Sequence, residues 1–330
     1  MIDRRTFLGT LSSGLLLAAP RAAQGQQAGR VWKVGYLTIN SPDAVRQFLG
    51  WLEAGLRDLG YVQGKDYVIE SRVATARADR LPGLARELVD ARVDLIIAGS
   101  NQEIAALKAA TTVIPIVMVV GVNPVGSGFV ASLAKPGGNI TGTTYDATPE
   151  GTAKNLEFLV DLVPRAKHVA VLWDPSFPGL GAYMESVKAA AGRLGVQIRA
   201  VAASSPEDLP TALVSLARAR DDAVLVMGST LFFARRADII AGLNGKRLPA
   251  IYWTRQLVDI VGLMSYGVNL RALWARTAIF LDKIFRGARP ADLPVEQPTQ
   301  FELVINLKTA KALGLTIPPS LLGRADEVIQ

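Results

Sequence analysis

The sequence predicts an α/β protein of two similar, doubly wound lobes that face each other across a cleft and are joined by a hinge. From Val31 onward, strand-like and helix-like segments alternate, which is typical of βαβ units around a parallel sheet. The pattern restarts at His168 as an internal repeat. The run 114–120 is short, apolar and rich in β-branched residues, as expected of a strand buried on both faces of such a sheet.

The first copy of the repeat alternates strands with helices. One predicted helix stops at Gly60, a usual helix terminator. The expected strands are 31–39, 67–73, 94–98 and 114–120, and the expected helices are 44–60, 80–91 and 102–110. The last strand breaks at Gly121 into a loop, and ligands of open α/β sheets collect where strands end at their carboxyl edge.

The second copy follows the first, segment by segment. Residues 168–175 echo 33–40, 183–195 echo the helix ending at Gly60, 209–220 echo 81–92, 223–229 echo 94–100, and 248–252 echo 114–118. The tail adds a helix at 270–286, an extended proline-rich segment at 290–298, a strand at 301–305 and a helix at 307–313. Because such a tail returns to complete the earlier lobe, we expect the chain to cross the hinge more than once. The expected N-terminal lobe is 29–143 plus 262–290, and the expected C-terminal lobe is 144–261 plus 291–330.

Residues 1–28 are predicted to be a signal peptide. A pair of arginines, Arg4 and Arg5, precedes a moderately apolar run at 8–19, a pattern that resembles a twin-arginine signal peptide. This run is too short for a permanent span of ~20 apolar residues. The alternative interpretation of this segment is an irregular N-terminal helix. With no cysteine in the chain, disulfides and a lipid anchor are not expected, so the sequence predicts an exported periplasmic protein.

Composition argues against several other functions. The net charge of +7 is scattered along the chain. No block of basic residues interleaved with aromatic ones is present, so nucleic-acid binding is not expected. The single histidine, His168, stands at a strand entry, and without cysteine the usual nucleophile–base pairs and transition-metal sites are missing. The segment 126–128 lacks the residues that complete a phosphate loop. We therefore expect no catalytic residues, no cofactor and no metal.

The candidate ligand-binding residues lie where strands are expected to end, or beside the hinge. They are Thr38, Asn40, Ser41, Gly99, Ser100, Asn101, Gly121, Asn123, Asp146, Trp173, Asp174, Gly228, Ser229, Thr230, Trp253, Arg255 and Tyr266. The segments 99–101 and 228–230 each open a helix, whose electropositive N-terminus suits a ligand carboxylate. Capping of the helix by Ser100 or Asn101 is the alternative interpretation.

The charged and aromatic candidates each have two interpretations. Arg255 suits a bidentate contact with a carboxylate or a surface salt bridge. Asp174 and Asp146 suit a ligand ammonium, although Asp174 precedes a proline and suits a turn cap equally well. The aromatics near strand ends suit either stacking on an apolar ligand or packing within a lobe. They are Trp173, Phe232, Tyr252, Trp253 and Tyr266.

Several segments carry a family resemblance. Ile114-Pro-Ile-Val, Pro124-Val125 and the segments 132–142, 262–267, 293–299 and 301–318 resemble the family of ABC-transporter substrate-binding proteins that includes tryptophan-binding members. The resemblance covers essentially the whole chain after the signal peptide. It implies a type I periplasmic binding protein fold and delivery of a small solute to an inner-membrane permease and its ATPase. We also expect the protein to be a monomer.

Two positions depart from the family pattern. Asn123 stands where the family usually has an acidic residue, and Val261 where it usually has a glycine. The expected function is binding of a small amino-acid-like or aromatic, carboxylate-bearing solute in the cleft. The alternatives are a periplasmic receptor that feeds a membrane sensor, and a two-lobed enzyme of glycosyltransferase type.

Overall fold

The computed structural model describes residues 30–145, 150–177 and 180–330. The predicted signal peptide and the candidate Asp146 lie outside these residues. Residues 31–330 form one compact unit. Within the described ranges, no helix has both the length and the apolar character needed to cross a membrane.

The first lobe is built on a five-stranded sheet in the order β2-β1-β3-β4-β5, with every pair parallel. Its strands are β1 (Trp32–Thr38), β2 (Tyr67–Val73), β3 (Leu95–Ala98), β4 (Ile116–Gly121) and β5 (Ile140–Thr144). Its helices are α1 (Pro42–Asp58), α2 (Leu81–Asp90) and α3 (Asn101–Ala110), with a short 3₁₀ turn η1 (Ala78–Arg80) before α2. All of β3 is buried, which agrees with a central strand covered on both faces.

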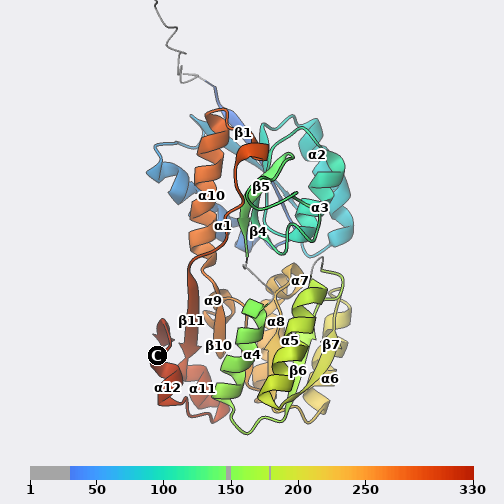
Figure 1. The fold of residues 1–330 in the computed structure, drawn as a ribbon, viewed down its shortest axis with the longest axis vertical. Coiled ribbons are helices and arrows are strands. Elements are labelled where there is room, and N and C mark those ends of the chain that lie inside the picture. Colours follow the sequence, from blue (N-terminus) through green and yellow to red (C-terminus); the bar gives the residue numbers. More distant parts are fainter. Residues whose placement is uncertain (1–29, 146–149, 178–179) are drawn as a thin grey trace, which may run out of the picture. The chain divides into compact units, whose positions relative to one another are not determined.

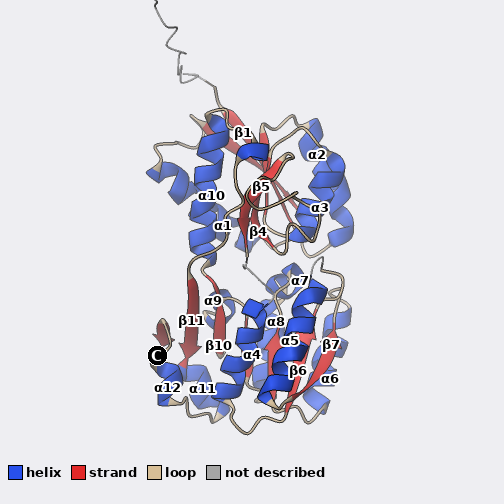
Figure 2. Cartoon of the chain, in the orientation of Figure 1, coloured by secondary structure: helices blue, strands red, loops and turns tan. Residues whose placement is uncertain are grey.

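The second lobe is built on a seven-stranded sheet in the order β12-β11-β10-β9-β8-β6-β7. Its strands are β6 (His168–Trp173), β7 (Gln197–Ala202), β8 (Ala223–Val226), β9 (Ala250–Tyr252), β10 (Met264–Val268), β11 (Phe301–Asn306) and β12 (Glu327–Ile329). Its helices are α4 (Glu150–Leu162), α5 (Leu180–Leu194), α6 (Asp208–Arg218), α7 (Thr230–Ala234), α8 (Arg236–Gly245), α9 (Arg255–Val258), α11 (Leu307–Leu313) and α12 (Pro319–Leu322). Only the pairing of β10 with β11 is antiparallel among the strand pairs described. Figure 2 shows helices flanking both sheets.

The two-lobed α/β class predicted from the sequence is confirmed, and the strand pairing departs from the expected lobe bounds at two places. Residues 264–268, predicted to lie in the N-terminal lobe, form β10 of the second sheet. Glu296, predicted to lie in the C-terminal lobe, lies beside β5: its N–H donates to Gly142 O at 2.9 Å, and its carbonyl accepts from Thr144 N at 2.9 Å. Strand pairing between residues far apart in sequence decided both assignments.

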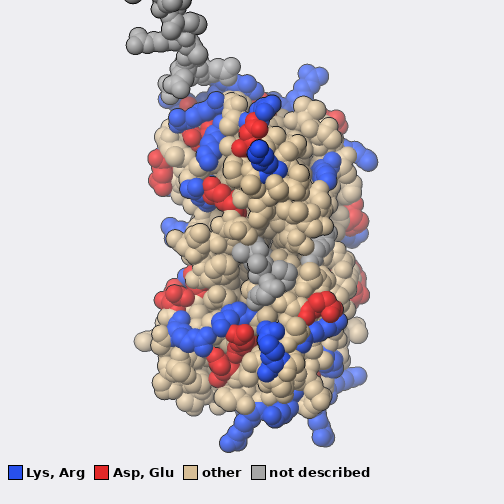
Figure 3. Space-filling view, viewed as in Figure 1, with Lys and Arg blue, Asp and Glu red and all other residues tan. Residues whose placement is uncertain are grey.

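The tail returns to the first lobe and then leaves it again. Helix α10 (Leu270–Phe285) packs alongside α1 (Figure 1). A short turn, η2 (Pro290–Asp292), follows and contacts β5. The chain therefore passes between the lobes after β5, between β10 and α10, and again before β11, as predicted for a chain that crosses the hinge more than once. On the face shown in Figure 3, basic and acidic side chains are interspersed, in agreement with the scattered charge.

One departure from the family pattern coincides with an unusual backbone conformation. Val261 has φ of +74°, in the left-handed region that favours glycine, and its side chain is 59% exposed. A β-branched residue is strained there, because its Cβ crowds the backbone. Asn123, the other departure, has φ of +44° in a turn, a conformation that asparagine tolerates better.

Candidate functional site

Strand ends of both sheets meet at a cavity of about 100 Å³. The first lobe supplies the loops after β1, β3 and β4, together with residues of α1 and α10. The second lobe supplies the loops after β8 and β9, one face of α4, and parts of α5, α7, β10 and β11. Of the predicted binding residues, eight line this cavity: Asn40, Gly99, Ser100, Gly228, Ser229, Thr230, Trp253 and Tyr266.

A buried carboxylate shapes the first-lobe wall. Glu103, in the first turn of α3, is fully buried and accepts hydrogen bonds from Ile39 N at 2.8 Å and Gly99 N at 2.5 Å. The carboxylate thereby ties the loop after β1 to the loop after β3, which carry Asn40 and Ser100 into the cavity. Burial raises the pKa of Glu103 to about 7, and the hydrogen bonds it accepts oppose that rise only in part.

The N-terminus of α3 lies at this wall. Ser100 is its N-cap residue, but the Ser100 side chain makes no capping hydrogen bond. Asn101 does not face the cavity; its amide donates to Val122 O at 2.7 Å and accepts from Val122 N at 2.8 Å. Asn40 donates its amide N–H to Thr38 Oγ1 at 3.1 Å, while its buried Oδ1 has no partner among the described residues. The wall thus offers a hydroxyl and a carbonyl oxygen beside a helix N-terminus.

The second-lobe wall contacts the first lobe directly. Ser229 caps α7 by accepting from Phe232 N at 3.1 Å. Thr230, the first residue of α7, donates to Gln102 Oε1 on α3 at 2.7 Å. Gly228 allows the ring of Trp253 to lie against the backbone, because a Cβ at this glycine would stand 2.8 Å from Trp253 Cδ1. The two lobes are therefore held together at the cavity.

A series of aromatic ring contacts crosses from one lobe to the other. Trp274 of α10 stacks on Phe48 of α1 with ring centroids 5.0 Å apart, and its edge meets Tyr36 at 5.5 Å. Phe48 then reaches Phe233 of α7 at 5.5 Å. Three of these four rings, those of Phe48, Phe233 and Trp274, line the cavity. Aromatic rings at a cavity wall suit stacking with a planar apolar ligand.

Aromatic side chains dominate the lining, and none of the described lining residues is charged. Nine of the chain's 10 Phe, 7 Tyr and 5 Trp residues face the cavity. They are Phe48, Tyr145, Phe177, Tyr183, Phe233, Trp253, Tyr266, Trp274 and Phe301. The polar groups are hydroxyls and amides, and the Oδ1 atoms of Asn40 and Asn155 are buried without a hydrogen-bond partner within the part of the chain that the structure describes. This lining suits a ligand that has a flat apolar part and a few hydrogen-bonding groups.

Several predicted residues of the first lobe do not line the cavity, and they form hydrogen bonds or close contacts within the loops and strand ends near it. Ser41 caps α1 by accepting from Ala44 N at 3.4 Å, and Thr38 accepts from Asn40 N at 3.1 Å. Asn123 accepts from Gly126 N at 3.1 Å within a turn. Gly121 ends β4, where a Cβ would stand 2.8 Å from Met118 Sδ. These residues stabilise the local backbone geometry. Their position at strand ends does not by itself distinguish that role from contact with a ligand.

The second lobe gives a similar result for two predicted residues. Asp174 accepts from Ser176 N at 3.0 Å and Ser176 Oγ at 2.6 Å, so the turn-cap interpretation fits its geometry. Burial raises its pKa. Trp173 packs against the core of the second lobe. The fully buried Phe232 and Tyr252 do not line the cavity either, and the neighbouring Phe233 does.

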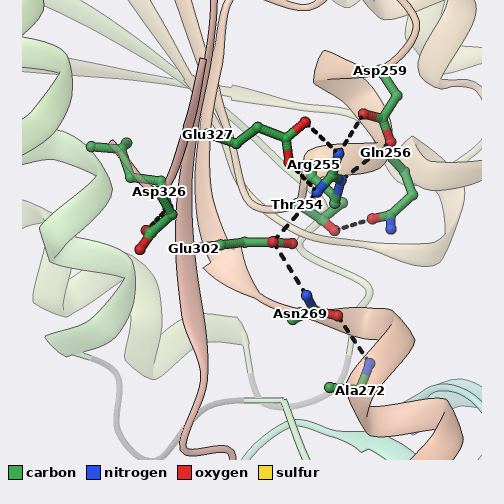
Figure 4. A network of polar contacts seen from close by, with 10 residues as sticks. Thr254, Arg255, Gln256, Asp259, Asn269, Ala272, Glu302, Asp326 and Glu327 are labelled. Carbon is green, nitrogen blue, oxygen red and sulfur yellow. Dashed lines mark hydrogen bonds and ion pairs between the residues drawn. The ribbon is translucent and has the colours of Figure 1, made fainter. Parts of the chain in front are cut away.

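Arg255 does not line the cavity, and the predicted carboxylate contact gives way to the salt-bridge interpretation. Its guanidinium donates to both carboxylate oxygens of Glu327, at 2.8 and 3.1 Å, and lies 3.3 Å from Asp259 and 3.6 Å from Glu302. Figure 4 shows these carboxylates around the guanidinium, with Asn269 bonded to Glu302. The hydrogen bonds to Glu327 raise the pKa of Arg255 further.

Sequence reasoning missed the cavity residues that come from helices. Phe48 and Trp274 lie on the buried faces of α1 and α10, and Asn155 lies on α4. Helical periodicity places Phe48 and Trp274 on apolar faces. That periodicity does not indicate which apolar residues face a cavity rather than the core.

The fold and the cavity define a two-lobed ligand-binding protein of the type I periplasmic binding protein class. A leucine-binding protein, LivK, from Thermotoga maritima has this fold, with a TM-score of 0.58 at 15% identity over 86% of this chain and 87% of that one. The chain belongs to the ABC transporter substrate binding protein family, whose model matches residues 33–329. The family recognised from the sequence is confirmed.

Two proteins that are 25% identical or more to this chain are linked to aromatic amino acids. The chain is 26% identical over 277 residues to a tyrosine-binding protein of Clostridioides difficile, covering 84% of this chain and 79% of that protein. It also matches an ABC domain from Streptococcus pneumoniae, solved in complex with L-Trp, with a TM-score of 0.83 at 25% identity over 91% of this chain and 100% of that one. The protein is thus the substrate-binding component of an ABC transporter, from a family of binding proteins and not of enzymes.

Proposed function

We propose that the protein binds an aromatic amino acid in this cavity and delivers it to the permease of an ABC importer in the periplasm. The observation that carries the proposal is the cavity itself: nine aromatic side chains and no described charged side chain, closed by strand ends of both lobes. The tyrosine-binding relative and the structure solved with L-Trp both have an aromatic amino acid as ligand. The paired arginines and apolar run at the N-terminus support the export.

The polar end of the ligand is assigned to the first-lobe wall. A carboxylate is favoured at the N-terminus of α3, where backbone N–H groups and the helix dipole favour negative charge. The hydroxyls of Ser100 and Ser229 offer further hydrogen bonds. The free Oδ1 of Asn40 is an acceptor for the ligand ammonium.

Ligand-driven closure follows from contacts that bridge the lobes. The hydrogen bond from Thr230 to Gln102 and the pairing of Phe48 with Phe233 join opposite lobes. A ligand held by both walls adds free energy to the closed state alone, which shifts the population toward it. The closed form is the one we expect the permease to recognise.

The experiment is a thermal-shift and calorimetry panel on the purified chain with L-tryptophan, L-tyrosine, L-phenylalanine, L-leucine and L-lysine. Aromatic amino acids are expected to stabilise the protein by ~2.7 kcal/mol at 100 times their Kd, and lysine is expected to have no effect. Phe48→Ala should abolish the shift. The matched control is Phe285→Ala, which removes a ring of α10 that stacks on Trp32 outside the cavity and should leave binding intact. Binding of leucine or lysine in preference to the aromatic set would overturn the proposal.

A further inference from the structure

Asn155 places a buried amide in the cavity without a partner for its oxygen. It lies on α4, where residues 151, 152 and 155 line the cavity, a spacing that puts them on one face of the helix. The side chain is 95% buried, and Oδ1 has no hydrogen bond to any described residue. Buried amide oxygens in native proteins are almost always paired, so this one calls for a donor that enters with the ligand.

The surroundings of Asn155 combine aliphatic side chains with the rings of two tyrosines. Helix α4 packs against α5 and against β8, β9 and β10. From these elements Leu180, Tyr183, Leu225 and Tyr266 line the same cavity. An unpaired amide oxygen is costly in a setting of low polarity, and Asn155 Oδ1 accepts no hydrogen bond from the described residues.

The position of Asn155 determines which end of the ligand it meets. Thr152 lies on α4 with Asn155, whereas the wall groups on Asn40, Ser100, Ser229 and Thr230 come from strand ends and the first turn of α7. The carboxylate site proposed above, at the N-terminus of α3, lies at those strand ends. The aromatic ring is then the part of the ligand that extends toward α4 and its apolar neighbours.

We propose that Asn155 is a specificity-determining residue: its Oδ1 accepts a hydrogen bond from a donor on the ligand's aromatic ring. This inference rests on the proposed function and narrows it to aromatic amino acids that carry such a donor, the phenol O–H of tyrosine or the indole N–H of tryptophan. Phenylalanine has neither and leaves Oδ1 unpaired. Sites built around a hydrogen bond reject the analogue that lacks it far more strongly than sites built on apolar contact alone.

The test is the ratio of affinities, measured by isothermal titration calorimetry on the full chain with L-tyrosine, L-tryptophan and L-phenylalanine. The unmodified protein is expected to bind tyrosine or tryptophan at least about 10-fold more tightly than phenylalanine. Asn155→Leu, of similar size and without the acceptor, should bring that ratio close to one while phenylalanine binding is kept. Asn155→Ala is a second variant should the leucine side chain not be accommodated.

Asn40→Leu is the matched control, because it removes the other unpaired amide oxygen of the cavity. It should weaken all three amino acids by a similar factor and leave the ratio unchanged. A protein that binds phenylalanine as tightly as tyrosine and tryptophan, or an Asn155→Leu variant that keeps the preference, would overturn the role of Asn155 while the proposed function stands. Failure of all three amino acids to bind would overturn the proposed function and this inference with it.

Discussion

The hydroxyl of Thr230 donates a 2.7 Å hydrogen bond to the amide oxygen of Gln102, and the two residues belong to opposite lobes. Thr230 begins α7 of the second lobe, and Gln102 lies in the first turn of α3 of the first lobe. The bond stands next to the aromatic pair Phe48–Phe233, which also bridges the lobes. Both contacts join the first lobe to the second.

Replacement of Thr230 with valine should weaken ligand binding without unfolding either lobe. Valine keeps the shape and removes the donor, so the closed state loses about 1 kcal/mol and the Kd rises by about 5-fold. Calorimetric titration measures the change. The control is Thr309→Val, which removes a hydroxyl bonded to Val261 O within the second lobe and should lower stability but not affinity. Unchanged affinity in Thr230→Val would argue that closure does not use this bond.

Glu103 should make the stability of the protein fall as pH rises. Its pKa lies at about 7 in the folded state against an ordinary value of 4.5, so between these pH values the folded state binds more protons than the unfolded state. The stabilisation is complete below pH ~4.5 and is lost as pH rises through ~7, on the order of 3 kcal/mol in all. Glu103→Gln removes this part of the pH dependence.

Urea unfolding at pH 5 and pH 8 measures the effect. The difference in unfolding free energy between the two pH values should be smaller in Glu103→Gln than in the unmodified protein. Glu207→Gln, at an exposed position before α6, serves as the control and should behave like the unmodified protein. Equal pH dependence in Glu103→Gln and the unmodified chain would show that Glu103 does not titrate in this range.

Val261→Gly should stabilise the protein, although it removes an apolar side chain. The left-handed φ of +74° strains a β-branched residue by ~1–3 kcal/mol, and the side chain is 59% exposed and contributes little burial. After the entropic cost of glycine, a net gain of about 1 kcal/mol is expected. The matched control is Val214→Gly on α6, 46% exposed in ordinary helix, which should lose up to about 1 kcal/mol. A loss of melting temperature in both variants would contradict the strain argument.

Arg255→Ala should leave ligand affinity unchanged. The guanidinium is bonded to Glu327 and lies beside Asp259 and Glu302 (Figure 4), and Arg255 does not line the cavity. Its removal leaves the half-buried Glu302 without its cation and should lower stability by ~1 kcal/mol. Ser100→Ala, at the cavity wall, is the contrasting variant and should weaken binding. An affinity loss in Arg255→Ala as large as that in Ser100→Ala would restore the carboxylate role predicted from the sequence.

Much of the fold was predictable because its signals are local. The alternation of β-branched runs with amphipathic segments follows from the periodicities of strand and helix, and the repeat at His168 indicates a second lobe. Elements with weaker patterns, such as β5, β7 and α4, were not predicted. The family was recognisable from contiguous segments such as 301–318, which need no tertiary information.

The residues of the candidate site likewise fall into those that the sequence predicted and those that it did not. Ser100, Ser229 and Trp253 were predicted because parallel strands bring their carboxyl ends to one edge, which is a property of topology. Phe48, Trp274 and Asn155 were not, because a helix face is apolar whether it meets a core or a cavity. The sequence suggested a ligand contact for Arg255. Its carboxylate partners, Glu302 and Glu327, lie much later in the chain and were not recognisable as partners from the sequence.

The sequence by itself determined the two-lobed α/β class, the strand-end loops and the family, because these depend on local periodicity, turn residues and contiguous motifs. Only the tertiary structure decided that β10 joins the second sheet, that α10 returns to α1, and which side chains face the cavity. Those outcomes depend on pairing and packing between distant segments, whose free energies are the sums of many small contacts that no local pattern records.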